Sequence, residues 1–350
     1  MMIIRPIEQK DLDALYHMAV NAGVGVTTLP ANRDQLQDKI ERAVKSFNES
    51  VSPERGHYLF VLEDTAQSRV VGVCGIEARV GLEDVWYNYR ISITVNASAD
   101  LAIHQQTPTL YLTNDLTNCS EVCSLFLEAD YRKGGNGLLL SKSRFMFLAD
   151  FPQYFSEKVF AEMRGVSDAN GNSPFWESLG KKFFSLDFSR ADYLTGVGNK
   201  AFIAELMPKY PIYVPMLGSE AQRALGQVHE NTRPARAMLE SEGFNFNGFV
   251  DIFDGGPVIE AFTNNIRAVR ESTKRHAMVV RHVPSSDELE DDLYMVSNRS
   301  FSGFRVGLVR ASRIRHDTID ISSELAEQLQ ICSGDTVRIV SLRDLRSSRK

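Results

Sequence analysis

The sequence has little cysteine and no long apolar run, and each scarcity excludes a class of protein. Its 350 residues include four cysteines, too few for a secreted disulfide scaffold, and no Cys-x-x-Cys pair that would indicate a zinc site. No stretch of about 18 apolar residues occurs, and charge and proline follow the start too closely for a signal sequence. We therefore expect a cytoplasmic protein without a membrane span and without a bound metal.

The composition is that of a globular protein. Hydrophobic residues make up 43% and charged residues 24% of the chain, and its 23 glycines and 12 prolines follow no Gly-X-Y period, which excludes collagen-like and low-complexity classes. A net charge of −6 argues against a general nucleic-acid binder and leaves room only for a local basic cleft that binds an anionic ligand. At roughly 100–150 residues per domain, the length allows more than one core.

Hydrophobic periodicity predicts an α+β fold with a mixed sheet. In the N-terminal part we expect strands at residues 2–5, 57–63, 70–80 and 87–95, and helices at residues 11–19 and 34–47. Residues 21–32 read as a polar loop, of the kind that often serves a ligand, and the short segment between the second and third strands suits an antiparallel hairpin.

A strand, a glycine-rich basic turn and a helix then follow one another. The strand at residues 121–127 is apolar throughout, and an amphipathic helix is expected to run to about Ala149. In the turn between them, Gly135 and Gly137 let the backbone approach an anion closely, the helix N-terminus offers unpaired N–H groups, and Arg132 adds positive charge. The turn matches neither a P-loop nor a dinucleotide-binding fingerprint, so a plain glycine turn remains the alternative.

The rest of the chain carries two helices with similar ends. Residues 173–180 follow a strand at 158–163 and read as a short helix with Ser as N-cap, Pro at its start and Gly at its end, and residues 232–243 repeat this pattern. The pair allows a duplicated core as one interpretation. Beyond an acidic loop at 285–292, strands at 304–310 and 336–342 flank a helix at 324–329, which predicts a small β-rich C-terminal appendage.

The order of strand, Arg-x-x-Gly-x-Gly turn, helix, strand and capped helix resembles the acyl-CoA half of GNAT-type N-acyltransferases. This resemblance implies that Arg132, Gly135 and Gly137 hold the pyrophosphate of CoA. It also implies that the strand before the turn splays from its neighbour, so that backbone at Leu125 polarises the thioester carbonyl. Without the resemblance, Leu125 is an ordinary core leucine.

Longer segments narrow the resemblance to the arginine N-succinyltransferase family. The segments that carry it are Thr28-Leu29-Pro30-Ala31-Asn32, Trp86-Tyr87-Asn88-Tyr89-Arg90, Ser141-Lys142-Ser143-Arg144-Phe145-Met146, Ala161-Glu162-Met163-Arg164-Gly165, Asp187-Phe188-Ser189-Arg190-Ala191-Asp192 and Asp251-Ile252-Phe253-Asp254-Gly255-Gly256-Pro257. The family resemblance implies succinyl-CoA as co-substrate, no permanently bound cofactor, and L-arginine as the acceptor in the first step of arginine catabolism. We also expect a homo-oligomer, while the net charge and the lack of a long apolar run argue against a nucleic-acid or membrane partner.

Acylation of an α-ammonium group requires a residue that moves protons, and His229 is the candidate. It lies in the polar segment before the second capped helix, and functional residues concentrate in such loops. The family resemblance points to the same residue, since Gly-Gln-Val-His matches the segment that holds the proposed proton donor. A solvated loop histidine is the alternative.

Charged residues that could bind arginine and the succinyl group are less distinct. Glu162, Arg164, Arg90 and Asp254 are candidates, and each could equally be a structural charge. We expect the loop at Thr27 and Thr28 to close over substrate. Cys119 and Cys123 are interpreted as structural, because no triad accompanies them.

These predictions divide the chain into three parts. Residues 1–180 form an acyl-CoA-binding core, residues 181–262 a second acyltransferase-like half that completes the active site, and residues 263–350 the C-terminal β-rich segment. Two alternative functions stay open, a subunit of an arginine/ornithine succinyltransferase and a non-catalytic acyl-CoA-binding regulator.

Overall fold

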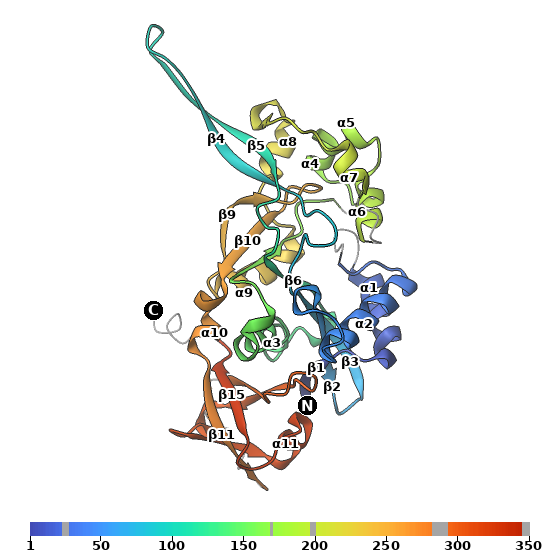
Figure 1. Cartoon of the computed structure of the whole chain (residues 1–350), viewed down its shortest axis with the longest axis vertical. Helices are drawn as coiled ribbons and strands as arrows, with labels where there is room; N and C mark the ends of the chain where they lie inside the picture. The colour runs from blue at the N-terminus through green and yellow to red at the C-terminus, as the bar shows by residue number, and fades with distance from the viewer. Residues whose placement is uncertain (23–27, 169–170, 197–200, 282–292, 345–350) are drawn as a thin grey trace.

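The structure, a computed structural model, describes residues 1–22, 28–168, 171–196, 201–281 and 293–344. In this part of the chain one mixed sheet has the strand order β14-β11-β15-β12-β13-β1-β2-β3-β6-β7-β10-β9-β4-β5-β8. Helices cover both of its faces (Figure 1). The predicted mixed class is confirmed.

The elements follow one another closely along the chain. The first half contains β1 (Met2–Pro6), α1 (Leu12–Ala22), α2 (Arg33–Phe47), β2 (His57–Asp64), β3 (Arg69–Glu77), β4 (Asn88–Ser98), β5 (Ile103–Thr113), β6 (Ser120–Leu127), α3 (Asn136–Asp150) and β7 (Lys158–Glu162). The middle contains α4 (Pro174–Ser178), α5 (Gly180–Phe184), α6 (Phe188–Gly196), α7 (Ala201–Leu206), β8 (Ile212–Tyr213), α8 (Ser219–Ala224), α9 (Arg233–Glu240), β9 (Asn245–Val250) and β10 (Pro257–Phe262). The last part contains α10 (Arg267–Glu271), β11 (Thr273–Val280), β12 (Leu293–Ser297), β13 (Val306–Arg310), β14 (Thr318–Ser322), α11 (Ser323–Leu329) and β15 (Thr336–Ser341).

Alternation along the central strands assigns the two faces of the sheet. In β2, Leu59 and Val61 pack with α1 and α2, whereas Phe60 and Leu62 pack with α3 on the opposite face. The predicted hairpin is confirmed, because β2 and β3 pair antiparallel along their length.

Helix α3 differs from the expected amphipathic helix. Every residue from Leu139 to Leu148 is buried. The sheet covers one side of this helix, while α10 and side chains of the C-terminal strands, such as Met295 and Val340, lie in the same core cluster. A helix enclosed on all sides needs no polar stripe, so its periodicity is weak.

The sequence analysis misread one glycine and missed several strands, namely β5, β8, β9, β10, β11, β12 and β14. Strand β5 pairs with β4 along its whole length, and together they form a long hairpin that projects from the body, which we call the arm (Figure 1). The sequence of β5 gives no clear strand pattern, because it contains several polar residues in succession and Pro108. Gly180 was expected to end a helix, but it is the first residue of α5. The position requires glycine, because a Cβ atom there would lie 2.2 Å from the Trp176 ring.

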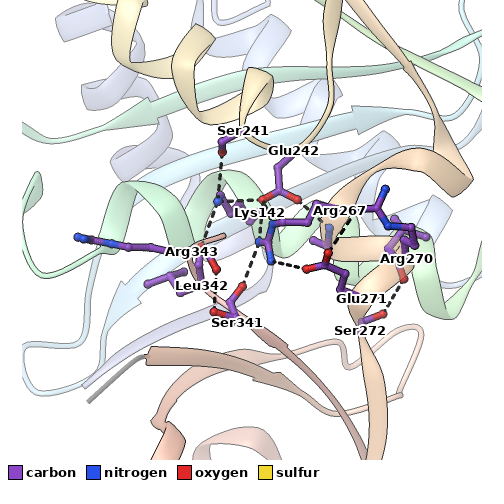
Figure 2. Close-up of polar contacts among 12 residues, drawn as sticks. Lys142, Ser241, Glu242, Arg267, Arg270, Glu271, Ser272, Ser341, Leu342 and Arg343 are labelled. Carbon is purple, nitrogen blue, oxygen red and sulfur yellow. Dashed lines mark hydrogen bonds and ion pairs between the residues drawn. The ribbon is translucent and has the colours of Figure 1, made fainter. Parts of the chain in front are cut away.

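A buried polar network ties the C-terminal segment to the core. Glu242, which follows α9, pairs with Lys142 of α3 at 2.8 Å and with Arg267 of α10 at 2.7 Å (Figure 2). Both cations also donate to β15 and the residue after it, Arg267 to the Ser341 carbonyl and Lys142 to the Leu342 carbonyl. The predicted β-rich character of this segment is confirmed, whereas the appendage and the duplication are not confirmed.

Candidate active site

The two central parallel strands part after a short paired stretch. Strand β6 pairs with β7 only at Ser120 with Val159 and at Glu121 with Phe160. A cavity of about 170 Å³ lies where they diverge, lined by the residues that follow on both strands. Its walls include Val122, Cys123, Ser124, Leu125, Ala161, Glu162, Met163 and Arg164.

A β-bulge distorts β6 beside this cavity. Its register with β3 shifts between Val73, opposite Phe126, and Gly75, opposite Cys123, so Ser124 and Leu125 together face one residue of β3. Ser124 has a φ of 55°, in the left-handed region that a side chain rarely adopts. The bulge places Leu125, the residue singled out from the sequence, in the wall of the cavity.

The glycine turn forms the start of α3. Gly135 is its N-cap with a φ of 84°, and a Cβ atom on Gly137 would come no nearer than 3.9 Å to another side chain. Among the described residues, none accepts a hydrogen bond from the Gly137 or Leu138 N–H groups. The Arg132 Nε donates to the Leu127 carbonyl at 3.0 Å, which ties the turn to the end of β6. The helix N-terminus therefore keeps N–H groups available to an anion.

His229 lies beside the cavity without lining it. Its N–H donates to the Arg164 carbonyl at 2.9 Å, next to a bridge between Val228 and Gly165. Its Nδ1 accepts from the Asn231 N–H at 3.2 Å, so the neutral ring carries its proton on Nε2. Partial burial and the Arg164 guanidinium lower the pKa of His229, which favours the neutral ring.

A larger cavity of about 420 Å³ adjoins the first and shares part of its wall. Both are lined by Thr28, Glu121, Glu162, Asp251 and Phe253. Carboxylates outnumber cations around the larger cavity, so a cationic ligand suits it. Glu121 and Asp251 were not among the sequence candidates, because neither a residue within β6 nor one directly after β9 gives a local signal of the cavity that it borders.

The charged candidates divide according to this geometry. Glu162, Arg164 and Asp254 line the smaller cavity. Arg90 does not line either cavity, and it pairs with Asp115 at 3.3 Å and lies over the Phe249 ring. Within the expected substrate loop, Thr28 lines both cavities, and Thr27 lies outside the described residues.

Asp254 is better placed to shape the site than to bind a cation. It is buried and accepts hydrogen bonds from the Gly165 and Gly256 N–H groups. Burial and the neighbouring Asp251 raise the pKa of Asp254 well above its usual range. A carboxyl group that tends to hold its proton pairs poorly with a guanidinium, whereas Glu162 accepts from Asn88 at 2.8 Å at the cavity wall.

The cysteines near the site have no feature of a nucleophile. Cys123 is buried in β6, and burial raises the pKa of its thiol well above the usual range. Burial likewise raises the pKa of Cys119, and raises that of Cys74 to about 11. A thiol that resists ionisation is a poor nucleophile, which supports the structural interpretation of Cys119 and Cys123.

Strands that part around a cavity, beside a glycine turn at a helix N-terminus, define a site of the acyltransferase type. The chain belongs to the arginine N-succinyltransferase family. The family model described as arginine N-succinyltransferase beta subunit matches residues 2–268, and the model for the C-terminal domain of that subunit matches residues 275–341. The resemblance inferred from the sequence is confirmed.

Individual relatives agree with this family. The chain is 50% identical over 344 residues to the arginine N-succinyltransferase of Yersinia pseudotuberculosis, and the match covers 98% of each chain. It is 51% identical over 342 residues to that of Escherichia fergusonii, again with 98% of both covered. Among solved structures, arginine/ornithine succinyltransferase subunit AI from Pseudomonas aeruginosa superposes with a TM-score of 0.89 at 33% identity, covering 98% of this chain and 99% of that one.

The described residues contain neither a membrane-spanning helix nor a metal-binding cluster. None of the described helices combines the length and apolar character that a bilayer span requires. Within the same residues, no group of three or more His, Cys, Asp or Glu side chains is arranged to bind a metal ion.

Proposed function

We propose that this chain transfers the succinyl group of succinyl-CoA to the α-amino group of L-arginine, giving N2-succinyl-L-arginine and CoA in the first step of arginine catabolism. The observation that carries the proposal is the cavity between β6 and β7, which has the Leu125 bulge in its wall and the N-terminus of α3 at the end of β6. Relatives that are named for this reaction match 98% of the chain, which supports the same function.

The acyl donor is assigned to the side of β6. We propose that the turn of Arg132, Gly135 and Gly137 binds the CoA pyrophosphate, with the free N–H groups of the α3 N-terminus directed at the anion. The thioester then lies in the opening between the strands. Backbone at Leu125 polarises its carbonyl and stabilises the oxyanion that forms when the amine attacks.

The acceptor is assigned to the acidic side of the cavities. Glu121 and Glu162 border both cavities and offer carboxylates to a guanidinium group, while Arg164 offers a cation to a carboxylate of either substrate. The arginine α-ammonium group first loses one proton, and the neutral α-amine attacks the thioester carbon. The C–S bond then breaks, the new amide nitrogen loses one further proton and keeps one, and CoA leaves as a thiolate that takes up a proton. His229 donates its Nε2 proton to the departing thiolate, and Nε2 takes a proton back from the amide nitrogen, because Nδ1 is occupied by the hydrogen bond from the Asn231 N–H.

Release of CoA thiol from succinyl-CoA tests the proposal. The rate should rise with arginine and saturate, and the product should be N2-succinylarginine by mass spectrometry. A comparison with ornithine separates this function from that of an arginine/ornithine succinyltransferase subunit. Binding of CoA without acceptor-dependent thiol release would identify a non-catalytic regulator and would overturn the proposal.

We also propose that the chain forms a homo-oligomer through the arm. Ile93 and Val95 lie on the same face of β4 as the buried Tyr89, further out along the arm. Their side chains are 56% and 53% exposed. From Ile91 to Thr113 the only Asp, Glu, Lys or Arg is Asp100, so two arms can pack without strong like-charge repulsion. We propose neither a nucleic-acid nor a membrane partner, and we propose a cytoplasmic location.

The three-part division stays a prediction. Residues 1–180 contain the parted strands and the glycine turn, and residues 181–262 bring His229 and α9 to the cavity. Residues 263–350 contribute β13, which pairs with β1 and extends the same sheet. We propose that the first two parts together form the catalytic unit.

A further inference from the structure

Arg144 is an unusual residue for the centre of a protein core. Its side chain lies in the middle of α3 and is 1% exposed. Among the described residues, no carboxylate forms an ion pair with its guanidinium, whose hydrogen bonds go to oxygens of Ser141, Gly75 and Cys123. A buried cation without an ion-pair partner is costly, so a residue of this kind calls for an explanation.

The two strand carbonyls that Arg144 binds lie at the bulge. Its Nη1 donates to the Cys123 carbonyl at 3.3 Å and to the Gly75 carbonyl at 3.4 Å, and these two residues are register partners on β6 and β3. The next residue along β6, Ser124, has the left-handed backbone. Arg144 therefore contacts the sheet where its regular pairing breaks.

The same peptide group is held from the other face of the sheet. The Ser124 N–H donates to the Thr28 Oγ1 at 3.2 Å, and Thr28 precedes α2, on the face opposite to α3. The carbonyl and the N–H of the peptide between Cys123 and Ser124 are thus bound on opposite faces. The C=O and N–H groups of such a peptide point toward the two faces of the sheet instead of toward the neighbouring strand. The regular pairing of β6 with β3 is therefore interrupted by a bulge.

We propose that Arg144 and Thr28 are positioning residues that hold this peptide across the sheet and thereby aim the backbone at Leu125 into the acyl cavity. Both residues also line that cavity. The inference rests on the proposed function for the identity of the thioester. Neither side chain reacts, and their effect is to fix the direction of a backbone hydrogen bond to the carbonyl.

Infrared or ¹³C NMR spectra of bound succinyl-CoA, labelled at the thioester carbonyl, test this inference directly. In the wild-type protein the carbonyl signal should shift from its value in free succinyl-CoA, because a backbone N–H polarises it. In Thr28→Val and Arg144→Lys the shift should be reduced. This spectrum needs no arginine, so a wild-type protein that gave the shift yet acylated no arginine would overturn the proposed function and leave the positioning inference standing.

Kinetics provide the second measurement. Thr28→Val, a change of similar size at a half-buried position, should lower kcat by up to about 10²-fold with little change in KM for succinyl-CoA, and Thr28→Ser should restore it. Arg338→Met is the matched control for Arg144, because Arg338 is also buried near α3 but pairs with Asp150, away from the cavity. It should lower the melting temperature and leave kcat unchanged. A folded Thr28→Val with the wild-type carbonyl shift and kcat would overturn the inference.

Discussion

The N–H of His229 donates to the carbonyl oxygen of Arg164, and this bond fixes the loop histidine beside the end of β7. The two side chains also interact, since the Arg164 guanidinium and partial burial both lower the pKa of His229. Partial burial first, and then a neighbour 65 positions earlier in the sequence, therefore favour the neutral ring of His229.

This relationship predicts opposite effects from two charge changes. Arg164→Gln removes a cation that disfavours imidazolium, so the pKa of His229 should rise and the acidic limb of the kcat/KM profile should move to higher pH. Glu230→Gln removes an anion that favours imidazolium, so the pKa should fall. NMR titration of the His229 ring measures both shifts without turnover. Two shifts of the same sign would contradict this electrostatic picture.

Replacement of His229 by Ala tests its proton-transfer role. We expect kcat to fall by about 10²–10⁴-fold, the usual contribution of a general acid–base group. His316→Ala is the control, because the His316 side chain is almost fully exposed and far along the chain in the C-terminal segment. Full turnover of His229→Ala, with an unchanged pH profile, would remove the histidine from the mechanism.

The glycine turn can be tested without loss of the fold. Gly137→Ala places a methyl group where the protein has room and where alanine favours the helix, so the melting temperature should stay equal or rise. The same methyl group obstructs an anion at the helix N-terminus, and KM for succinyl-CoA should rise about tenfold, equivalent to ~1.4 kcal/mol. Gly218→Ala, at the N-cap of α8, should leave KM unchanged. An unchanged KM in Gly137→Ala would favour the plain-turn alternative.

The buried network predicts a large loss of stability. Glu242→Gln leaves the buried Lys142 without a carboxylate and leaves Arg267 with only the longer pair to Glu271, and the free energy of unfolding should fall by about 3–5 kcal/mol. Glu240→Gln, which breaks an exposed pair with Arg236, should cost at most about 1 kcal/mol. Urea unfolding compares the two. Equal losses would show that the network in Figure 2 adds little to stability.

The arm predicts an oligomer that one substitution can weaken. Ile93→Asp places a charge on the apolar face, and sedimentation should show a lower mass than for the wild type. Asn96→Asp places the same charge on the polar face and should leave the mass unchanged. A wild-type protein that sediments as a monomer would exclude the proposed interface.

Local signals in the sequence were sufficient for most elements of the first half of the chain, up to β7, and for fewer of those that follow. The apolar run before the glycine turn predicted β6, and Ser173 with Pro174 marked the start of α4, where the Ser173 hydroxyl accepts from the Trp176 N–H. These features depend on neighbours within a few residues, so the chain alone displays them. Strand β5 and the enclosure of α3 depend on what packs against them, and periodicity does not report that.

For the candidate site too, some features were evident from the sequence and others depend on the tertiary structure. By itself the sequence determined the residue types of the turn, the polar histidine loop and, through resemblance over long segments, the family. Only the tertiary structure decided that β6 and β7 part, that Thr28 and Arg144 hold one peptide from opposite faces, and that Arg90 stays outside the cavities. Contacts between residues far apart in the chain set these distances, because side chains pack in three dimensions and a local pattern cannot fix which distant partner they meet.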